Sequence, residues 1–370
     1  MTAGLSGAAR AAVEDVLAAA WGGRVTLASA TALAQRDHVV RVETGDGRHA
    51  VVKLPRPAEQ SLWPNDPEGL AVEWASLEHL AAVAPGTAPE LLGGDDQQGL
   101  VVMEALAAGS SLDESLLGGD PAQAREDVLA WTQALARLHA RTQGTAAGFA
   151  AARARRGLLP GRDPWWLERL AAAAPSFTAE AHERGVAPEA VAADLDRVRT
   201  LLATSHVGLV HGDPCPDNVL LTPAGCRLID FERASVASVA LDFAYLLAPF
   251  PSCWCFGLLP PGLVADATAA YEATLAGAGV SLGDAWGEAV AASLALFAVV
   301  RVGGRRGRAV DEADRWGTTT ARPRLAAWTA SLLDAPGARA FPHLVAAVAA
   351  WRDDHGLDAS VEVPGYPALG

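Results

Sequence analysis

The sequence predicts an α+β fold of two lobes, with a small antiparallel sheet in the first third and mainly helices after it. Short apolar runs separated by turn residues dominate the first hundred residues, and helical periodicity dominates after residue 112. A length of 370 residues is enough for two lobes that each bury a core. We place the first lobe at 1–103, a hinge at 104–109 and a mainly helical second lobe at 110–370.

Composition narrows the class of protein. With 51% hydrophobic and 19% charged residues, the chain is globular rather than disordered. A net charge of −14 argues against a nucleic-acid partner, because binding a phosphate backbone requires a basic face. The same charge permits a cationic substrate, although many proteins are acidic without one.

Nothing in the sequence predicts a membrane partner. The N-terminal Ala-rich segment contains Glu14 and Asp15, which is unlike a secretory signal. The longest uncharged run, 289–300, is too short to span a bilayer, and we expect it to be a buried helix. We therefore expect a cytoplasmic protein.

The elements of the first lobe follow from apolar runs and turn residues. We expect a helix over 12–20, then strands over 25–31, 39–43 and 48–54. Gly45-Asp46-Gly47 predicts a hairpin between the second and third strands. The small residues from Ser29 to Gln35 predict a loop between the first two strands.

The next expected helix, 68–83, carries an acidic residue on its apolar stripe. Glu73 falls within that stripe, whereas Glu68 and Glu78 lie off it; the stripe is formed by Leu70, Leu77 and Leu80. A carboxylate facing the core needs a cationic partner or a shifted pKa. Lys53, at the end of the third strand, is the natural partner. A solvent-facing lysine and a partly exposed glutamate at the helix edge are the alternatives.

The segment Leu209–Glu232 is the most informative one. It reads LVHGDPCPDNVLLTPAGCRLIDFE and places Asp213, Asn218 and Asp230 in an apolar setting. If its two apolar runs pair as a hairpin about Ala224, Asn218 faces Asp230 with Cβ atoms about 4.5–5.5 Å apart. Amide and carboxylate oxygens of this kind suit Mg²⁺. An ordinary hairpin with a polar mouth is the alternative.

These motifs resemble those of a known family. The spacing His211-Gly212-Asp213-x-x-x-x-Asn218, followed by Asp230-Phe231-Glu232, is that of the protein-kinase signature. Gly212 and Glu232 depart from that signature and are similar to the aminoglycoside phosphotransferase and choline kinase-like family, small-molecule kinases with a protein-kinase-like fold. The resemblance extends over about residues 25–250.

The resemblance implies an enzyme and assigns roles. The γ-phosphoryl group of ATP (or GTP) would pass to a hydroxyl of a small molecule, with Mg²⁺ as the metal cofactor. Asp213 would accept or orient the proton of the acceptor hydroxyl. Asn218 and Asp230 would hold Mg²⁺, and Lys53, oriented by Glu73, would bind the phosphates in a nucleotide-binding first lobe.

The resemblance also suggests further phosphate contacts. The chain has neither G-x-G-x-x-G between the first two strands nor a Walker A motif. In the family this loop is often poor in glycine, so Ser29 and Thr31 are candidate contacts to the phosphates. They are equally well explained as turn formers.

A short apolar strand over 100–103 precedes the hinge. In the family the hinge holds adenine through backbone groups, which makes the carbonyl of Glu104 and the N–H of Leu106 the candidates. Met103 would flank the base, a role that is compatible with a core position.

Other residues of the second lobe leave more than one interpretation open. Asp242 would steady the catalytic loop, as in the family, or cap a helix, and His211 would pack beneath that loop. Trp254 could stack on a sugar or base, but a core position is favoured. A basic cluster either forms a solvated turn or contacts an anionic group of the substrate or nucleotide. The cluster comprises Arg301, Arg305, Arg306 and Arg308.

The four cysteines show no zinc-type spacing. They are Cys215, Cys226, Cys253 and Cys255. Cys253-Trp254-Cys255 alone is a weak metal signal, so we expect reduced, mostly structural thiols.

The acceptor cannot be identified from the sequence. An aminoglycoside or another antibiotic, and hence a role in antibiotic resistance, is the first expectation. A sugar, an amino alcohol or a nucleoside comes next. A nucleotide-binding pseudokinase is disfavoured because the five catalytic polar positions are filled. A protein kinase is disfavoured by Gly212, by Glu232 and by the lack of an Ala-Pro-Glu segment after Asp230.

Overall fold

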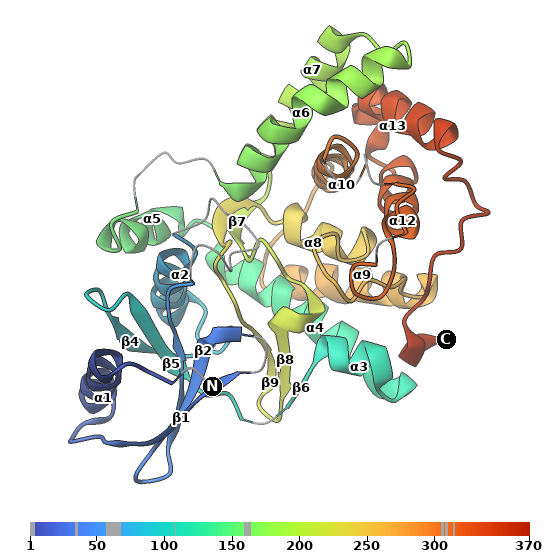
Figure 1. Cartoon of the computed structure of the whole chain (residues 1–370). Helices are drawn as coiled ribbons and strands as arrows, with labels where there is room; N and C mark the ends of the chain where they lie inside the picture. The colour runs from blue at the N-terminus through green and yellow to red at the C-terminus, as the bar shows by residue number, and fades with distance from the viewer. Residues whose placement is uncertain are drawn as a thin grey trace. The chain divides into compact units, whose positions relative to one another are not determined.

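The computed structural model describes residues 4–33, 36–56, 68–107, 109–158, 164–304, 307, 310–313 and 315–370. It divides into two compact units (Figure 1). Unit 1 comprises Met1–Gly109, Ala147–Pro160 and Thr222–Ala234, and unit 2 comprises Ser110–Ala146, Gly161–Leu221 and Ser235–Gly370. Unit 1 thus includes two later segments that the sequence-based division did not assign to the first lobe. The expected α+β class is confirmed.

Unit 1 is built on a five-stranded sheet in the order β1-β2-β3-β5-β4, with antiparallel neighbours. The strands are β1 Leu27–Leu33, β2 Arg36–Thr44, β3 His49–Lys53, β4 Leu91–Asp95 and β5 Leu100–Glu104. Gly47 has a φ of 82° and its N–H donates to Thr44 O, so the hairpin expected at Gly45-Asp46-Gly47 is present. Helix α1 (Gly7–Trp21) packs its buried residues Val13 and Leu17 into the core of the sheet.

Helix α2 (Gly69–Val83) is more deeply buried than its sequence pattern suggests. Residues 72–77 are all buried, whereas Leu70, a member of the predicted apolar stripe, is only half-buried. The stripe therefore does not define the buried face of this helix. Glu78, which lies off the apolar stripe, is half-buried, and its carboxylate lies 2.7 Å from Arg155 of α5 (Ala146–Arg155). Strand β9 (Gly225–Leu228) joins this unit through a hydrogen bond from Leu228 N–H to Thr87 O.

Unit 2 is mainly helical. Its longer helices are α4 Pro121–Thr142, α6 Trp165–Glu183, α7 Pro188–Thr204, α9 Pro261–Gly277, α10 Trp286–Val302, α12 Ala321–Leu333 and α13 Pro342–Asp354. The shorter ones are α3 Leu112–Gly118, α8 Ala240–Leu247, η2 Pro216–Asn218, η3 Ala338–Ala340 and η4 Pro367–Leu369. Helix α4 begins where Asp120 accepts hydrogen bonds from two N–H groups and Pro121 occupies the first turn.

Two strand pairs complete unit 2. Strand β7 (Val207–Val210) pairs antiparallel with β10 (Ser235–Ser238), and β6 (Ser110–Ser111) pairs antiparallel with the middle of β8 (Val219–Thr222). These pairings anchor the two ends of the segment 211–218, which runs from β7 to β8.

The buried helix expected over 289–300 is confirmed as α10, which packs against α6, α7, α8 and α12 (Figure 1). Within the described ranges, none of the helices combines the length and the apolar character needed to cross a bilayer.

Candidate active site

Lys53 in unit 1 contacts two acids. It is the last residue of β3, and its Nζ lies 2.5 Å from Glu73 Oε2 and 2.7 Å from Asp230 Oδ1. Lys53 is 7% exposed and Glu73 is 1% exposed. The ion pair predicted from the position of Glu73 in its helix is therefore present. The second partner, Asp230, was not predicted to contact Lys53.

Asp230 and Glu232 extend this charge cluster. Glu232 Oε1 lies 3.7 Å from Lys53 Nζ and 3.2 Å from Arg56 Nη2. Asp230 has a φ of 69°, in the left-handed region that Asp tolerates better than most residues and that is often found at functional sites. Carboxylate oxygens of Glu73, Asp230 and Glu232 lie within 4.8 Å of one another, close enough to share one cation.

The cluster separates the pKa values of its acids. Burial opposes ionisation of Asp230, but Lys53 beside it holds the pKa of that carboxyl below its usual range. Burial, with Asp230 nearby, raises the pKa of Glu232 to about 8. Burial alone would lower the pKa of Lys53, yet the neighbouring Asp230 and Glu73 raise it, so the ammonium stays charged.

In unit 2, the His211-Gly212-Asp213 loop follows β7 and is held from below by Asp242. Gly212 has a φ of 82°, a conformation that explains glycine at this position. The Asp242 carboxylate accepts hydrogen bonds from the N–H of His211 at 2.6 Å and of Gly212 at 2.9 Å. It also lies 3.1 Å from His139 Nε2.

This geometry decides between the two interpretations of Asp242. Asp242 steadies the loop, and the N-cap of α8 is Val239 instead. His211 is fully buried, and its Nδ1 accepts a hydrogen bond from the N–H of Asp213, in agreement with the expected packing role.

Asp213 is half-buried and its side chain is fixed by donors from a second segment. Asp213 Oδ1 accepts hydrogen bonds from the hydroxyl of Ser252 at 2.5 Å and, more weakly, from that of Tyr245 at 3.4 Å. Cys215 Sγ lies 3.1 Å from the same oxygen. Asn218 is buried, and its Nδ2 donates to the backbone carbonyl of Asp213 at 2.9 Å. Asn218 and Asp230 belong to different units, so their joint binding of Mg²⁺ stays a prediction.

Sequence reasoning missed Ser252 and Tyr245. Tyr245 lies three residues after Asp242 on α8, so helical spacing could have placed both on the face that meets the loop. Ser252 lies in an irregular segment and carries no comparable signal.

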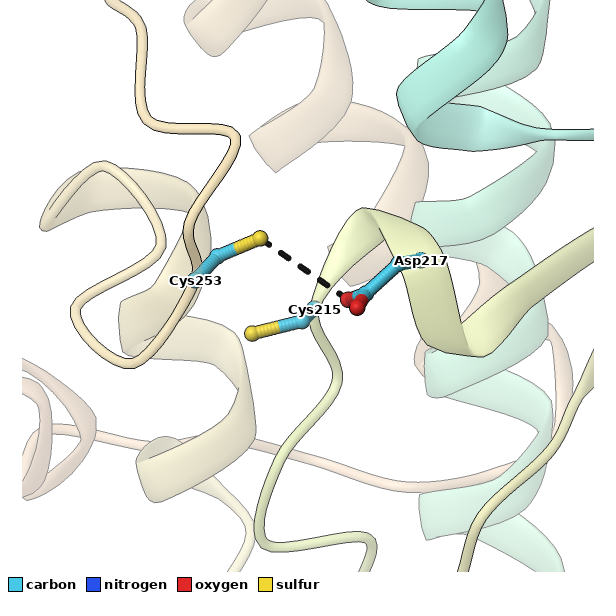
Figure 2. Close-up of side chains that lie close together, drawn as sticks. All are labelled: Cys215, Asp217 and Cys253. Atoms are coloured by element: carbon cyan, nitrogen blue, oxygen red, sulfur yellow. Dashed lines mark hydrogen bonds between the residues drawn. The ribbon is translucent and has the colours of Figure 1, made fainter. Parts of the chain in front are cut away.

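A group of thiols adjoins this loop. Figure 2 shows Cys215 and Asp217 on one segment and Cys253 on another, with Cys253 Sγ 3.8 Å from Asp217 Oδ1. Cys255 Sγ lies 2.6 Å from Cys253 Sγ. All four cysteines of the chain are buried and free. Burial opposes ionisation of Cys253, but hydrogen bonds from Cys215 and Cys255 lower the pKa of its thiol to about 5.

Trp254 is not a core residue. Its side chain is 40% exposed, and its indole N–H donates to Asp217 Oδ2 at 3.3 Å. The backbone carbonyls of Cys253 and Trp254 accept hydrogen bonds from the buried guanidinium of Arg324. The aromatic ring is thereby presented at the surface of unit 2.

Ser29 and Thr31 do not lie in a loop. Both belong to β1, where they pair with Glu43 and Arg41 of β2, and both are exposed. The small residues that suggested a loop form a strand because β2 supplies partners for their backbone groups. Residues 34–35, between the two strands, lie outside the described residues.

The hinge residues lie at the end of the sheet. Met103 is 4% exposed on β5, opposite Val51, and Glu104 N–H donates to Glu90 O. Leu106 is half-buried beyond the strand. Their contacts with adenine stay predictions.

Of the basic cluster, Arg305, Arg306 and Arg308 lie outside the described residues. Arg301 is half-buried with its guanidinium 5.2 Å from the ring centre of Trp328, a cation–π contact rather than a solvated turn.

Comparisons with known proteins identify the family and the fold of this chain. A family model described as "Phosphotransferase enzyme family" matches residues 30–279, more than half of the chain. No curated protein matches the chain.

Solved structures match along almost their whole length. A candidate aminoglycoside phosphotransferase from Ralstonia eutropha JMP134 is 17% identical with a TM-score of 0.53, over 93% of this chain and 98% of its own. A choline/ethanolamine kinase family protein from Mesorhizobium loti is 15% identical with a TM-score of 0.50, over 91% and 98%. These similarities confirm the protein-kinase-like fold. The chain belongs to the phosphotransferase enzyme family and is a phosphotransferase that acts on a hydroxyl group of a small molecule.

Proposed function

We propose that this phosphotransferase moves the γ-phosphoryl group of ATP, or GTP, to a hydroxyl of an amine-bearing small molecule. An aminoglycoside is the first candidate and an amino alcohol the second. The observation that carries the proposal is the buried Lys53–Glu73–Asp230 cluster, because a lysine fixed between two acids is prepared to bind phosphates.

On the donor side, Lys53 neutralises phosphate charge and Glu73 fixes the direction of its ammonium group. Asp230 and Asn218 would hold Mg²⁺. The residues present fit this ion, because Asp230 shares a group of hard carboxylate oxygens with Glu73 and Glu232. Bound Mg²⁺ supplies neutralisation of the charge that develops on the phosphates.

On the acceptor side, Asp213 accepts the proton of the attacking hydroxyl or orients it. The hydrogen bonds that Ser252 and Tyr245 donate to Oδ1 fix the orientation of this carboxylate. Asp242 holds the loop backbone, so Asp213 is prepositioned before the acceptor binds.

Two features favour an acceptor with an amine. The net charge of −14 attracts cations at long range. The exposed ring of Trp254, two residues after Ser252, is suited to a cation–π contact or to stacking on a sugar ring. A neutral sugar or nucleoside would use only the stacking.

The test is a screen for nucleoside diphosphate release with purified protein, Mg·ATP or Mg·GTP, and a panel of aminoglycosides, amino alcohols, sugars and nucleosides. N-acetylated forms of each amine serve as matched neutral controls. The proposal predicts release that depends on an amine-bearing acceptor and is lost on acetylation. Equal release with neutral sugars would contradict the acceptor class, and nucleotide binding without release in any case would contradict catalysis.

A further inference from the structure

The thiol group beside the catalytic loop has the composition of a metal site. Sγ of Cys215, Sγ of Cys253 and a carboxylate oxygen of Asp217 lie within 4.8 Å of one another (Figure 2). Cys215 and Cys253 are each 2% exposed. Two buried sulfurs and one oxygen of the half-buried Asp217 are donors that a soft or borderline divalent cation prefers over Mg²⁺.

The distances suit tetrahedral zinc. Bonds of ~2.3 Å to sulfur and ~2.0 Å to oxygen place a sulfur and an oxygen ligand ~3.5 Å apart and two sulfur ligands ~3.8 Å apart. Cys253 Sγ and Asp217 Oδ1 are 3.8 Å apart, so an ion between them requires only a small adjustment. Cys255 Sγ is only 2.6 Å from Cys253 Sγ, too close for both to bind one ion, and we assign it no ligand role.

Buried polar atoms without partners provide a second, independent observation. Asp113 is 8% exposed, and its Oδ1 is buried without a hydrogen-bond partner among the described residues; the same holds for the hydroxyl of Tyr366, which is 1% exposed. Asp113 lies in the first turn of α3, which packs against η2, the short helix that carries Asp217, and against η4, next to Tyr366.

A buried carboxylate oxygen that lacks a donor is costly. A nearby cation would offset that cost.

We propose that Cys215, Cys253 and Asp217 bind one zinc ion, with the fourth position open to water. Zinc binds the thiolate form of cysteine, so protons compete with the ion and the affinity falls as the pH falls. The ion links the loop of Asp213 to the segment that carries Ser252, and thereby fixes the hydroxyl that contacts Asp213. Its three ligands are different residues from the predicted Mg²⁺ ligands Asn218 and Asp230, and the inference does not depend on the proposed function.

The sequence alone did not indicate this site. Two ligands lie in Cys-x-Asp at 215–217, and the third, Cys253, follows Asp217 by 36 residues. This spacing is not that of a known zinc motif.

The test measures zinc affinity of the full chain under reducing conditions. The protein is dialysed against a chelator and titrated with Zn²⁺ in competition with a chromophoric chelator, and bound zinc is counted by elemental analysis. We expect one zinc per chain in the wild type and a loss of affinity of at least about 100-fold in Cys253→Ser. Cys226→Ser is the matched control, because Cys226 is also a buried thiol but belongs to unit 1 and is not a proposed ligand, and it should retain wild-type affinity.

Titration of the wild type with Co²⁺ gives an independent readout. Thiolate ligation predicts an intense sulfur-to-cobalt absorption that the Cys226→Ser variant keeps. Absence of stoichiometric zinc, or equal affinity in Cys253→Ser and Cys226→Ser, would overturn the proposal. If Cys253→Ser does not fold, the cobalt spectrum of the wild type and the zinc affinity of Asp217→Asn decide the question.

Discussion

Removing either partner of the Lys53–Glu73 pair has unequal consequences for stability. Glu73→Gln removes one negative charge but keeps an oxygen that accepts from Lys53 Nζ, and Lys53 still contacts Asp230 at 2.7 Å. We expect this variant to lose about 1–2 kcal/mol, the scale of one hydrogen bond to a charged group.

Lys53→Met leaves three carboxylates, those of Glu73, Asp230 and Glu232, within 4.8 Å of one another. Breaking a buried ion pair costs about 3–5 kcal/mol. Protonation of Glu232, whose pKa is already raised to about 8 by burial and by Asp230, keeps the loss within that range. Urea unfolding of both variants at one pH should therefore show Lys53→Met as the less stable.

Turnover separates Glu73 from its neighbours. Because an orientation error of about 1 Å can cost on the order of 100-fold, we expect Glu73→Gln to lower kcat by at least about that factor while remaining folded. Glu68→Gln and Glu78→Gln are the controls. The Glu78 side chain is 28% exposed and pairs with Arg155, so its loss should cost about 0.5 kcal/mol or less and leave kcat unchanged. Equal kcat in all three glutamine variants, or a Lys53→Met variant as stable as Glu73→Gln, would refute the reasoning.

Three further predictions concern Asp213, the proposed Mg²⁺ ligands and the pH dependence of stability. Asp213→Asn keeps the contact with Ser252 and should lower kcat by about 10²–10⁴-fold with unchanged nucleotide affinity; calorimetry and the release assay check both, and near wild-type kcat would exclude Asp213 as the base. Asn218→Ala and Asp230→Asn should each weaken binding of Mg·ATP in calorimetry, and unchanged affinity and Mg²⁺ dependence in both would rule out the proposed magnesium ligands. Burial, with Arg56 beside it, lowers the pKa of His38 to about 4, below its unfolded value of about 6.5, so the unfolded state binds more protons and stability is lost as the pH falls from 6.5 towards 4. His38→Gln should abolish about 1–2 kcal/mol of that loss after allowance for screening by solvent, and an identical pH slope in urea unfolding would contradict the assignment.

Local patterns predicted the elements that depend on local physics. The hairpin at Gly45-Asp46-Gly47 follows from turn chemistry, and the long buried helix α10 follows from an unbroken apolar run. Strand β4 was not predicted, because two consecutive glycines, Gly93 and Gly94, usually interrupt a strand. In the structure, Gly93 has a φ of 142°, and a Cβ on Gly94 would come within 2.5 Å of Trp74, so both glycines serve the strand.

The candidate site was predictable where one element carried the information. The position of Glu73 in its helix was enough to predict its partner Lys53. The motif from His211 to Asp230 located the loop of Asp213 and the segment that carries Asp230. The loop expected at Ser29 was wrong because pairing with β2 overrides the weak strand preference of small residues.

Contacts made by irregular segments could not be predicted. Ser252 and Cys253 approach Asp213 and Asp217 only because the chain after α8 folds back over the catalytic loop. No periodicity along the sequence records such a contact.

Identification of the phosphorylated product tests the central claim most directly. Purified protein is incubated with Mg·ATP and the best acceptor from the screen, and the product is analysed by mass spectrometry and by phosphorus NMR, with Asp213→Asn run in parallel. The account predicts an acceptor heavier by one phosphoryl group, carried as a phosphate monoester on a hydroxyl, and almost none with Asp213→Asn. Phosphate on nitrogen, or equal amounts of product with both proteins, would contradict it.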